Sequence, residues 1–156
     1  VMLQNNFTGP LPNFFNNPRL YYCHLYGNSF SGAIPVIQSN ALQYFYVHSN
    51  QLTSFGGLET PNLRRLFISY NLITGAIPDM NNLTLCYDFY MNNNNFTDYT
   101  EGALVACRSL YRIDISNNPN LPAGAVNNIV ADLIANHENN PRGGISVNLA
   151  KTSTAY

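Results

Sequence analysis

The side chains of this sequence that could carry acid–base, nucleophilic or metal chemistry are few. The 156 residues include three histidines, three cysteines and eight carboxylates. His24 and His48 are expected on neighbouring strands, two residues out of register, and no third ligand stands near enough to complete a metal site. His137 falls near the end of an expected helix, facing solvent. Since no G-x-S-x-G, H-E-x-x-H or phosphate-binding glycine loop occurs, we expect neither enzymatic activity nor a cofactor.

Two aspartates could suggest paired carboxylates for acid–base work. Asp88 and Asp114 occur in neighbouring repeats, but Arg65 and Arg112 accompany them and would neutralise such a pair. These four side chains fit two interpretations. They fix the register of a bound ligand, or they form a cross-strand ion-pair ladder that needs none.

Recognition is the chemistry that the composition favours. The chain has 11 Tyr and 9 Phe and lacks Trp. Tyrosine offers a flat apolar ring for a sugar or a peptide, together with a hydroxyl that orients the ligand. Aromatic side chains also stabilise sheets by packing across strands, so a purely structural interpretation stays open. The expected contacts are Tyr22, His24, Tyr26, Tyr44, Tyr46, His48, Arg65, Phe67, Tyr70, Asp88, Tyr90 and Arg112.

Charge and hydropathy exclude several classes of partner. Only 10% of residues are charged and the net charge is −1. Electrostatics therefore give no reason to expect nucleic acid or an anionic membrane surface. No apolar run approaches the length that would insert into a bilayer. The hydrophobic share of 46% suffices for the core of one domain.

The elements that must position these side chains follow from an internal repeat. The pattern apolar-x-x-apolar-x-apolar-x-x-Asn ends at five asparagines, and a degraded copy ends near Asn5. Anchors at 5, 28, 50, 71, 94 and 118 are separated by 23, 22, 21, 23 and 24 residues. Alternating apolar residues predict a strand with one buried face. We expect the anchors to form a structural ladder, their amides binding backbone groups of the turn and of the neighbouring coil: Asn5, Asn28, Asn50, Asn71, Asn94 and Asn118.

This pattern and period resemble the leucine-rich repeat. The phrase Gly-x-Ile-Pro, in residues 28–35 and again in 71–78, resembles the plant-specific type of that repeat. The resemblance implies an α/β solenoid, coiled right-handed. It places a parallel β-sheet on the concave face and short helices or turns on the convex side. The expected single domain has repeats at about 1–19, 20–41, 42–62, 63–85, 86–109 and 110–120, and a cap over 121–156.

Two segments depart from the repeat. Residues 96–109, FTDYTEGALVACRS, read as a short helix. Residues 122–139 predict a longer amphipathic helix, and Ile145 and Val147 an alternating strand. This helix–strand cap is loosely similar to the ends of bacterial and phage surface repeat proteins. Its expected inward stripe is Val126, Ile129, Val130, Leu133 and Ile134.

Cysteines and sequons leave alternatives open. Cys23 and Cys86 are expected too far apart for a disulfide, whereas Cys86 and Cys107, in adjacent coils, could pair. Three Asn-x-Ser/Thr sequons could carry glycans if the host glycosylates: Asn6, Asn82 and Asn95.

Together these features predict a non-enzymatic recognition or adhesion module that acts outside the cell. Its expected partner is a surface protein or a glycan, bound through the aromatic concave face, with the module part of a virion or microbial surface fibre. One alternative is a structural subunit of a fibre or capsid decoration, assembled by self-association through uncapped solenoid ends. The other is a eukaryotic receptor-like ectodomain. No nucleic acid and no membrane insertion are expected.

Overall fold

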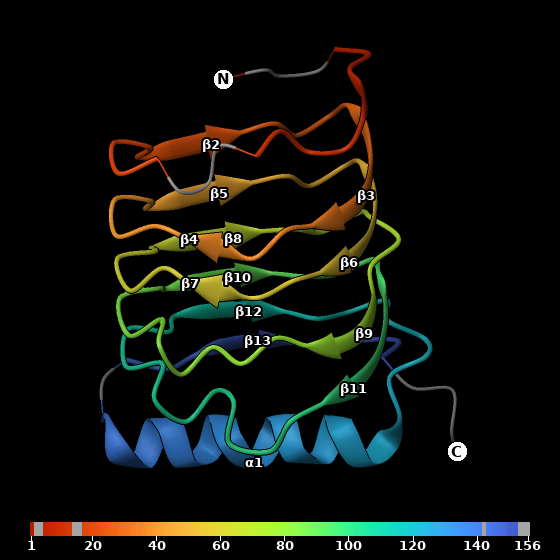
Figure 1. Ribbon diagram of the computed structural model, residues 1–156. Coiled ribbons are helices and arrows are strands. Elements are labelled where there is room, and N and C mark those ends of the chain that lie inside the picture. The colour runs from red at the N-terminus through yellow and green to blue at the C-terminus, as the bar shows by residue number, and fades with distance from the viewer. Residues whose placement is uncertain (2–4, 14–16, 142, 153–156) are drawn as a thin grey trace.

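Stacked coils of similar length make up the chain in a computed structural model, which describes residues 1, 5–13, 17–141 and 143–152 (Figure 1). Each coil from residue 20 onwards contributes one short strand to a six-stranded parallel sheet. The architecture is the predicted leucine-rich-repeat solenoid. The strands of this sheet, from one end to the other, are β2 (Tyr22–His24), β5 (Tyr44–Tyr46), β8 (Arg65–Phe67), β10 (Asp88–Tyr90), β12 (Arg112–Asp114) and β13 (Ser146–Asn148).

The hydrophobic core runs along the inner side of this sheet. The middle residue of each repeat strand points inward, as the alternation predicts, and Phe45, Leu66 and Phe89 are fully buried. The apolar residue two positions later is buried as well, with Val47 and Ile68 as examples. A repeat of 21 to 24 residues therefore adds one layer to a continuous core, which explains why a single coil could not fold alone.

On the convex side the chain forms some of the expected turns, and it also forms short strands that were not expected. The Gly-x-Ile-Pro phrases lie in β3 (Ser29–Ile34) and β9 (Thr74–Ile77). Gly32 and Gly75 adopt φ of 80° and 92°, a bend that glycine permits, and the buried isoleucine follows. The further strands of this side are β1 (Thr8–Gly9), β4 (Ile37–Gln38), β6 (Gln51–Phe55), β7 (Leu58–Glu59) and β11 (Asn95–Tyr99), paired β1-β3-β6, β9-β11 and β4-β7.

The prediction of a short helix over residues 96–109 is wrong. The segment forms most of β11, which pairs in parallel with β9, and then a run of turns. Phe96 and Tyr99 are buried in the strand, and Ala103, Leu104 and Cys107 are buried along the turns. Gly102, with φ of 88°, interrupts any helical run. Pairing with the preceding coil thus wins over the local helical propensity.

The cap contains the expected helix and strand, but only part of the expected apolar stripe is inside. Helix α1 (Ala123–Asn139) crosses the lower end of the coils (Figure 1). Val130 and Ile134, expected inside, are 41% and 55% exposed. Ile129 and Leu133 of the expected stripe are buried, and Val126 is partly buried against the core. The other buried residues of the helix are Ala125, Asp132 and Asn136. The last coil offers backbone groups that need hydrogen bonds, so two polar residues take positions that an apolar stripe would have claimed. Among the described residues no helix is long and apolar enough to cross a membrane.

All three cysteines are reduced and buried. Cys86 and Cys107 therefore do not form the disulfide that was one alternative; the Cys107 thiol instead donates to the Met80 carbonyl at 3.1 Å. Burial raises the pKa of Cys23 to about 12 and that of Cys86 well above its usual value. The thiols thus act as small core side chains.

Candidate functional site

The outward side of the six-stranded sheet carries most of the predicted contact residues. Strand register aligns one row across the sheet as Tyr22, Tyr44, Arg65, Asp88, Arg112 and Ser146. A second row, two residues further along each strand, is His24, Tyr46, Phe67, Tyr90, Asp114 and Asn148. We call this surface the concave face. It collects side chains that are far apart in the sequence into one continuous sheet surface.

The aromatic rings of the concave face stack on one another. Tyr46 lies between His24 and Phe67, with ring centroids 4.5 Å away on each side and interplanar angles of 13° and 22°. Tyr22 and Tyr44 stack at 4.8 Å, and Tyr26 and His48 at 4.4 Å. Phe67 and Tyr90 meet edge to face at 4.6 Å. Since neighbouring rings cover the flat faces within the rows, the edges and hydroxyl groups are what a ligand meets.

The two histidines of the aromatic stack, His24 and His48, lie in surroundings that disfavour their charged form. His24 Nε2 and His48 Nδ1 are buried and have no hydrogen-bond partner among the described residues. Burial lowers the pKa of both imidazoles, the N-terminal amine adding to the effect on His24 and His24 to that on His48. A proton on either ring would place a charge inside the aromatic stack.

We expect the protein to lose stability as the pH falls from about 7 to about 5. The folded state keeps the pKa of His24 and His48 below the usual value of 6.5, so the unfolded chain binds more protons in this range. Urea unfolding at both pH values measures the effect. The double variant His24→Phe, His48→Phe keeps two rings in the stack and removes the titration. Its stability should vary less with pH, and an equal variation would contradict the assignment.

An ion triad occupies the middle of the concave face. Asp88 is almost fully buried and accepts from Arg65 Nε at 3.1 Å and from Arg112 Nε at 2.9 Å. The Arg65 Nε also donates to the Tyr87 hydroxyl at 2.9 Å. Hydrogen bonding to Tyr46 raises the pKa of Arg65. Three of the four side chains that the sequence left as a possible cross-strand ion-pair ladder thus pair with one another: Arg65, Asp88 and Arg112.

The triad still leaves cationic groups at the surface. The side chains of Arg65 and Arg112 are 35% and 45% exposed. Two guanidinium groups share one carboxylate, so the cluster carries an excess positive charge. Asp114 does not join it and instead accepts from Ser116 and Asn148. Tyr87, which comes just before β10, was missed in the sequence because it falls outside the alternating rows.

Tyr70 stands apart from the aromatic rows. It precedes the anchor Asn71, is 58% exposed and adopts φ of 54°. Each of the five repeats with anchors from Asn28 to Asn118 has a residue with positive φ at this position, so the conformation is a property of the repeat. The equivalents are Gly27, Ser49, Asn93 and Asn117. No ring contact joins Tyr70 to the other described aromatic residues, so Tyr70 lies outside the aromatic stack of the concave face.

The anchor asparagines form a ladder beneath the turns that follow the sheet strands. Asn71 is typical: its Nδ2 donates to the carbonyls of Val47, Ile68 and Ser69, and its Oδ1 accepts from the Leu52 amide. The first of these bonds crosses to the preceding coil. Asn28, Asn50, Asn94 and Asn118 are also buried and bond in the same way within their own turns. Asn5, expected to begin the ladder, is exposed.

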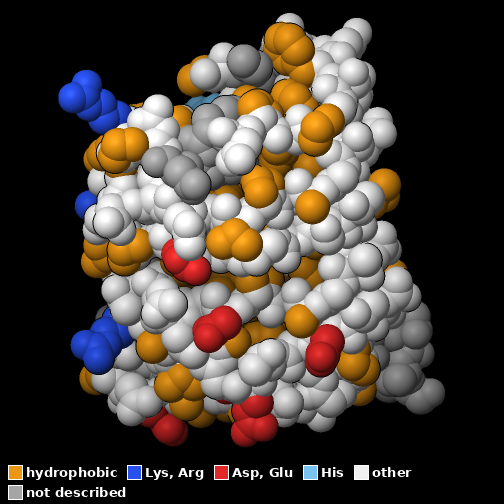
Figure 2. Space-filling view, in the orientation of Figure 1, with side chains coloured by type: hydrophobic (Ala, Val, Ile, Leu, Met, Phe, Trp, Pro, Cys, Tyr) orange, Lys and Arg blue, Asp and Glu red, His pale blue; other side chains and the backbone are white. Residues whose placement is uncertain are grey.

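The remaining candidates lie away from the concave face. The sequon asparagines Asn6 and Asn82 are exposed, whereas Asn95 is half-buried at the start of β11. Within the described residues no three His, Cys, Asp or Glu side chains gather as a metal site would require. Figure 2 shows apolar side chains scattered over the visible face and carboxylates mainly over its lower half. Neither feature marks a second site on that face.

A family model and one solved structure with a TM-score above 0.5 support the fold. Residues 62–83 match the Leucine Rich Repeat family model. A crystal structure of a TDR receptor is 23% identical, with a TM-score of 0.52, and the match covers 74% of this chain and 26% of that one. The plant peptide hormone receptor RGFR1, in complex with RGF2, is also 23% identical, with a TM-score of 0.43. That match covers 75% of this chain and 28% of the receptor chain. The chain thus spans about a quarter of each. No curated protein matches.

Proposed function

We propose that this leucine-rich-repeat chain is a binding module that recognises a protein or peptide through its concave face, outside the cell. The observation that carries the proposal is the in-register surface of rings, hydroxyls and two half-exposed guanidiniums, held rigid by stacking and by buried Asp88. Rigid aromatic and arginine side chains lose little entropy on binding and dominate many interfaces. The TDR receptor that shares this fold is a receptor by name.

Ring geometry favours a peptide over a glycan as the ligand. A sugar ring binds best against the flat face of an aromatic side chain, and both faces of Tyr46 are covered by neighbouring rings. Peptides instead offer amides for the tyrosine hydroxyls and carboxylates for Arg65 and Arg112, which would bind as charge-assisted pairs. Adhesion to a glycan, a place on a virion and assembly into a fibre are the other roles that the sequence raised, and no contact in the structure favours them.

A displayed library of extended peptides, selected on the folded chain, tests the proposal. We expect the triple variant Tyr46→Ala, Phe67→Ala, Tyr90→Ala to bind selected peptides at least about 100-fold more weakly, because it removes three central contacts. The matched control replaces three exposed apolar residues that lie outside the sheet strands, Val36→Ala, Leu72→Ala and Leu85→Ala, and should bind normally.

Circular dichroism must show that both variants are folded. The single variant Arg112→Gln, at a half-exposed side chain, provides a second test that leaves the ring stack intact. It should weaken the binding of peptides that carry a carboxylate more than the binding of peptides that lack one. Binding that survives the triple variant, or a glycan array that responds where the peptide library does not, would overturn the proposal.

A further inference from the structure

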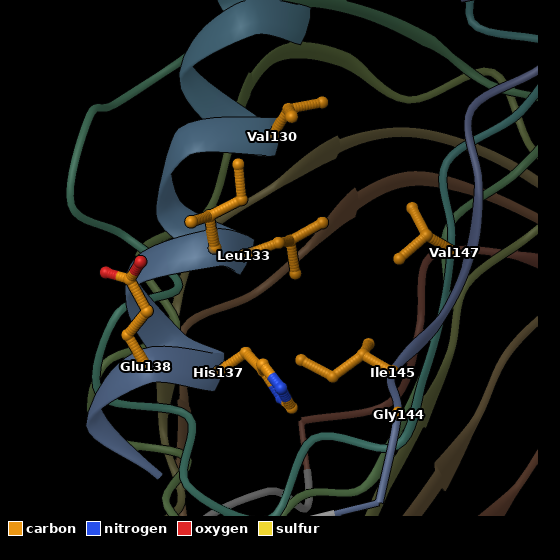
Figure 3. Close-up of a pocket in the computed structure, with 8 residues that line it drawn as sticks. Val130, Leu133, His137, Glu138, Gly144, Ile145 and Val147 are labelled. Carbon is orange, nitrogen blue, oxygen red and sulfur yellow. The ribbon is translucent and has the colours of Figure 1, made fainter. Parts of the chain in front are cut away.

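The C-terminal end of the solenoid has an apolar pocket that the concave face does not include. It lies between α1 and β13 and has a volume of about 450 Å³. Figure 3 shows Val130, Leu133 and His137 on the helix facing Ile145 and Val147 on the last segment of the chain, with Glu138 directed away. A pocket of this size can hold apolar side chains of a ligand.

The pocket is an uncovered part of the hydrophobic core. Val147 is aligned with Ile113 in β12, and Ile113 with Phe89 in β10; those two residues are 2% and 0% exposed, because a further coil covers each. Val147 is 43% exposed. Val130 and Ile134 of α1, at 41% and 55%, lie beside it. Among the described residues, neither the cap helix nor another segment fills the place beside Val147 that one more strand would take.

The edge of β13 offers backbone hydrogen bonds at the same place. β13 is the last strand of its sheet and pairs only with β12 among the described residues. Ser146 donates to the Tyr111 carbonyl, and the Asn148 carbonyl accepts from Ile115, so both residues bond towards β12. In a parallel ladder successive residues bond to opposite sides. The amide and carbonyl of Val147 therefore point to the open edge, next to the pocket that its side chain lines.

We propose that β13 and this pocket bind an extended segment of a partner protein, which adds to the sheet as a further strand parallel to β13. The segment reads polar–apolar–polar, and its apolar side chain of leucine or isoleucine size enters the pocket. A lipid or a small apolar molecule could fill the pocket but could not pair with the Val147 amide and carbonyl. This is strand addition, in which main-chain bonds supply affinity and the side-chain pocket supplies specificity.

A synthetic peptide with the sequence of residues 109–117, SLYRIDISN, is a suitable probe, because β12 within it already pairs in parallel with β13. We expect saturable binding to the whole chain by calorimetry and slower hydrogen exchange at the Val147 amide. A peptide with aspartate at the central isoleucine should bind at least about tenfold more weakly. Absence of binding at millimolar peptide, or exchange that slows elsewhere on the chain, would overturn the proposal.

Two variants of the chain test the two parts of the proposal. Val147→Pro removes the outward amide while the bonds of Ser146 and Asn148 to β12 stay available, and Ile134→Asp places a charge in the pocket at a residue that is 55% exposed. Each variant should weaken the binding of the peptide about tenfold. Leu85→Ala, at an exposed apolar residue remote from the pocket, is the matched control. Unchanged binding in both variants, or a dimer formed through this edge that excludes the peptide, would overturn the proposal.

Discussion

Replacing Asn71 by alanine is expected to lower the free energy of unfolding by about 4 kcal/mol. The substitution removes three donated hydrogen bonds and one accepted bond. The buried Leu52 amide loses its acceptor, whereas the Val47 carbonyl loses its bond to the next coil and keeps the Asn50 side-chain amide as a donor. Asn71 is only 6% exposed, so water cannot readily replace the amide. Buried backbone groups without partners cost far more than the net gain of a typical hydrogen bond.

Urea unfolding followed by circular dichroism measures this loss. Asn82→Ala is the matched control, because Asn82 is exposed and lies outside the ladder; its effect should stay within about 0.5 kcal/mol. Asn71→Asp keeps the size of the side chain but loses the donors and buries a charge, so it should destabilise the protein as well. A loss below about 1 kcal/mol in Asn71→Ala would show that the ladder does not hold the coils together.

The sheet side of the fold could be predicted because its determinants are local and repeated. Period-two alternation fixes which strand residues are buried, and the repeat spacing aligns Tyr46 with Phe67 and Phe67 with Tyr90 without any long-range information. The opposite side could not be predicted in this way. Residues 96–109 have helical propensity, but β11 gains its hydrogen bonds from β9, one coil earlier, and a local pattern cannot report that pairing.

The sequence predicted which side chains share the concave face, but not how these side chains pack against one another. Register predicts which side chains share the concave face, yet it does not show that Tyr46 is covered on both faces by rings. Nor does it show that Asp88 is buried between two arginines and that Tyr87 supports one of them. These features depend on side-chain rotamers across neighbouring coils. They are the reason why, of the two partners that the sequence left open, we propose a protein or peptide and not a glycan.

The second large effect on stability is expected in the cap helix, where the apolar pattern of the sequence does not identify all of the buried residues. An apolar stripe along residues 126–134 is the usual sign of an inward helix face. In the structure Asn136 is fully buried and donates to the carbonyls of Leu104, Val105 and Cys107 at 2.8, 3.1 and 3.1 Å. Asp132, also buried, accepts a hydrogen bond from the Tyr99 hydroxyl. Burial raises the pKa of Tyr99, and this hydrogen bond raises it further.

We therefore expect Asn136→Ala to destabilise the protein by about 3 kcal/mol and Ile134→Ala by less than about 0.5 kcal/mol. The first leaves three carbonyls of the last coil without their shared donor, whereas the second shortens a side chain that is 55% exposed. The order is the reverse of what the apolar stripe alone predicts. Urea unfolding gives both values, and amide exchange along α1 should quicken only in Asn136→Ala. A larger loss in Ile134→Ala would mean that Ile134, like Ile129 and Leu133, packs into the core.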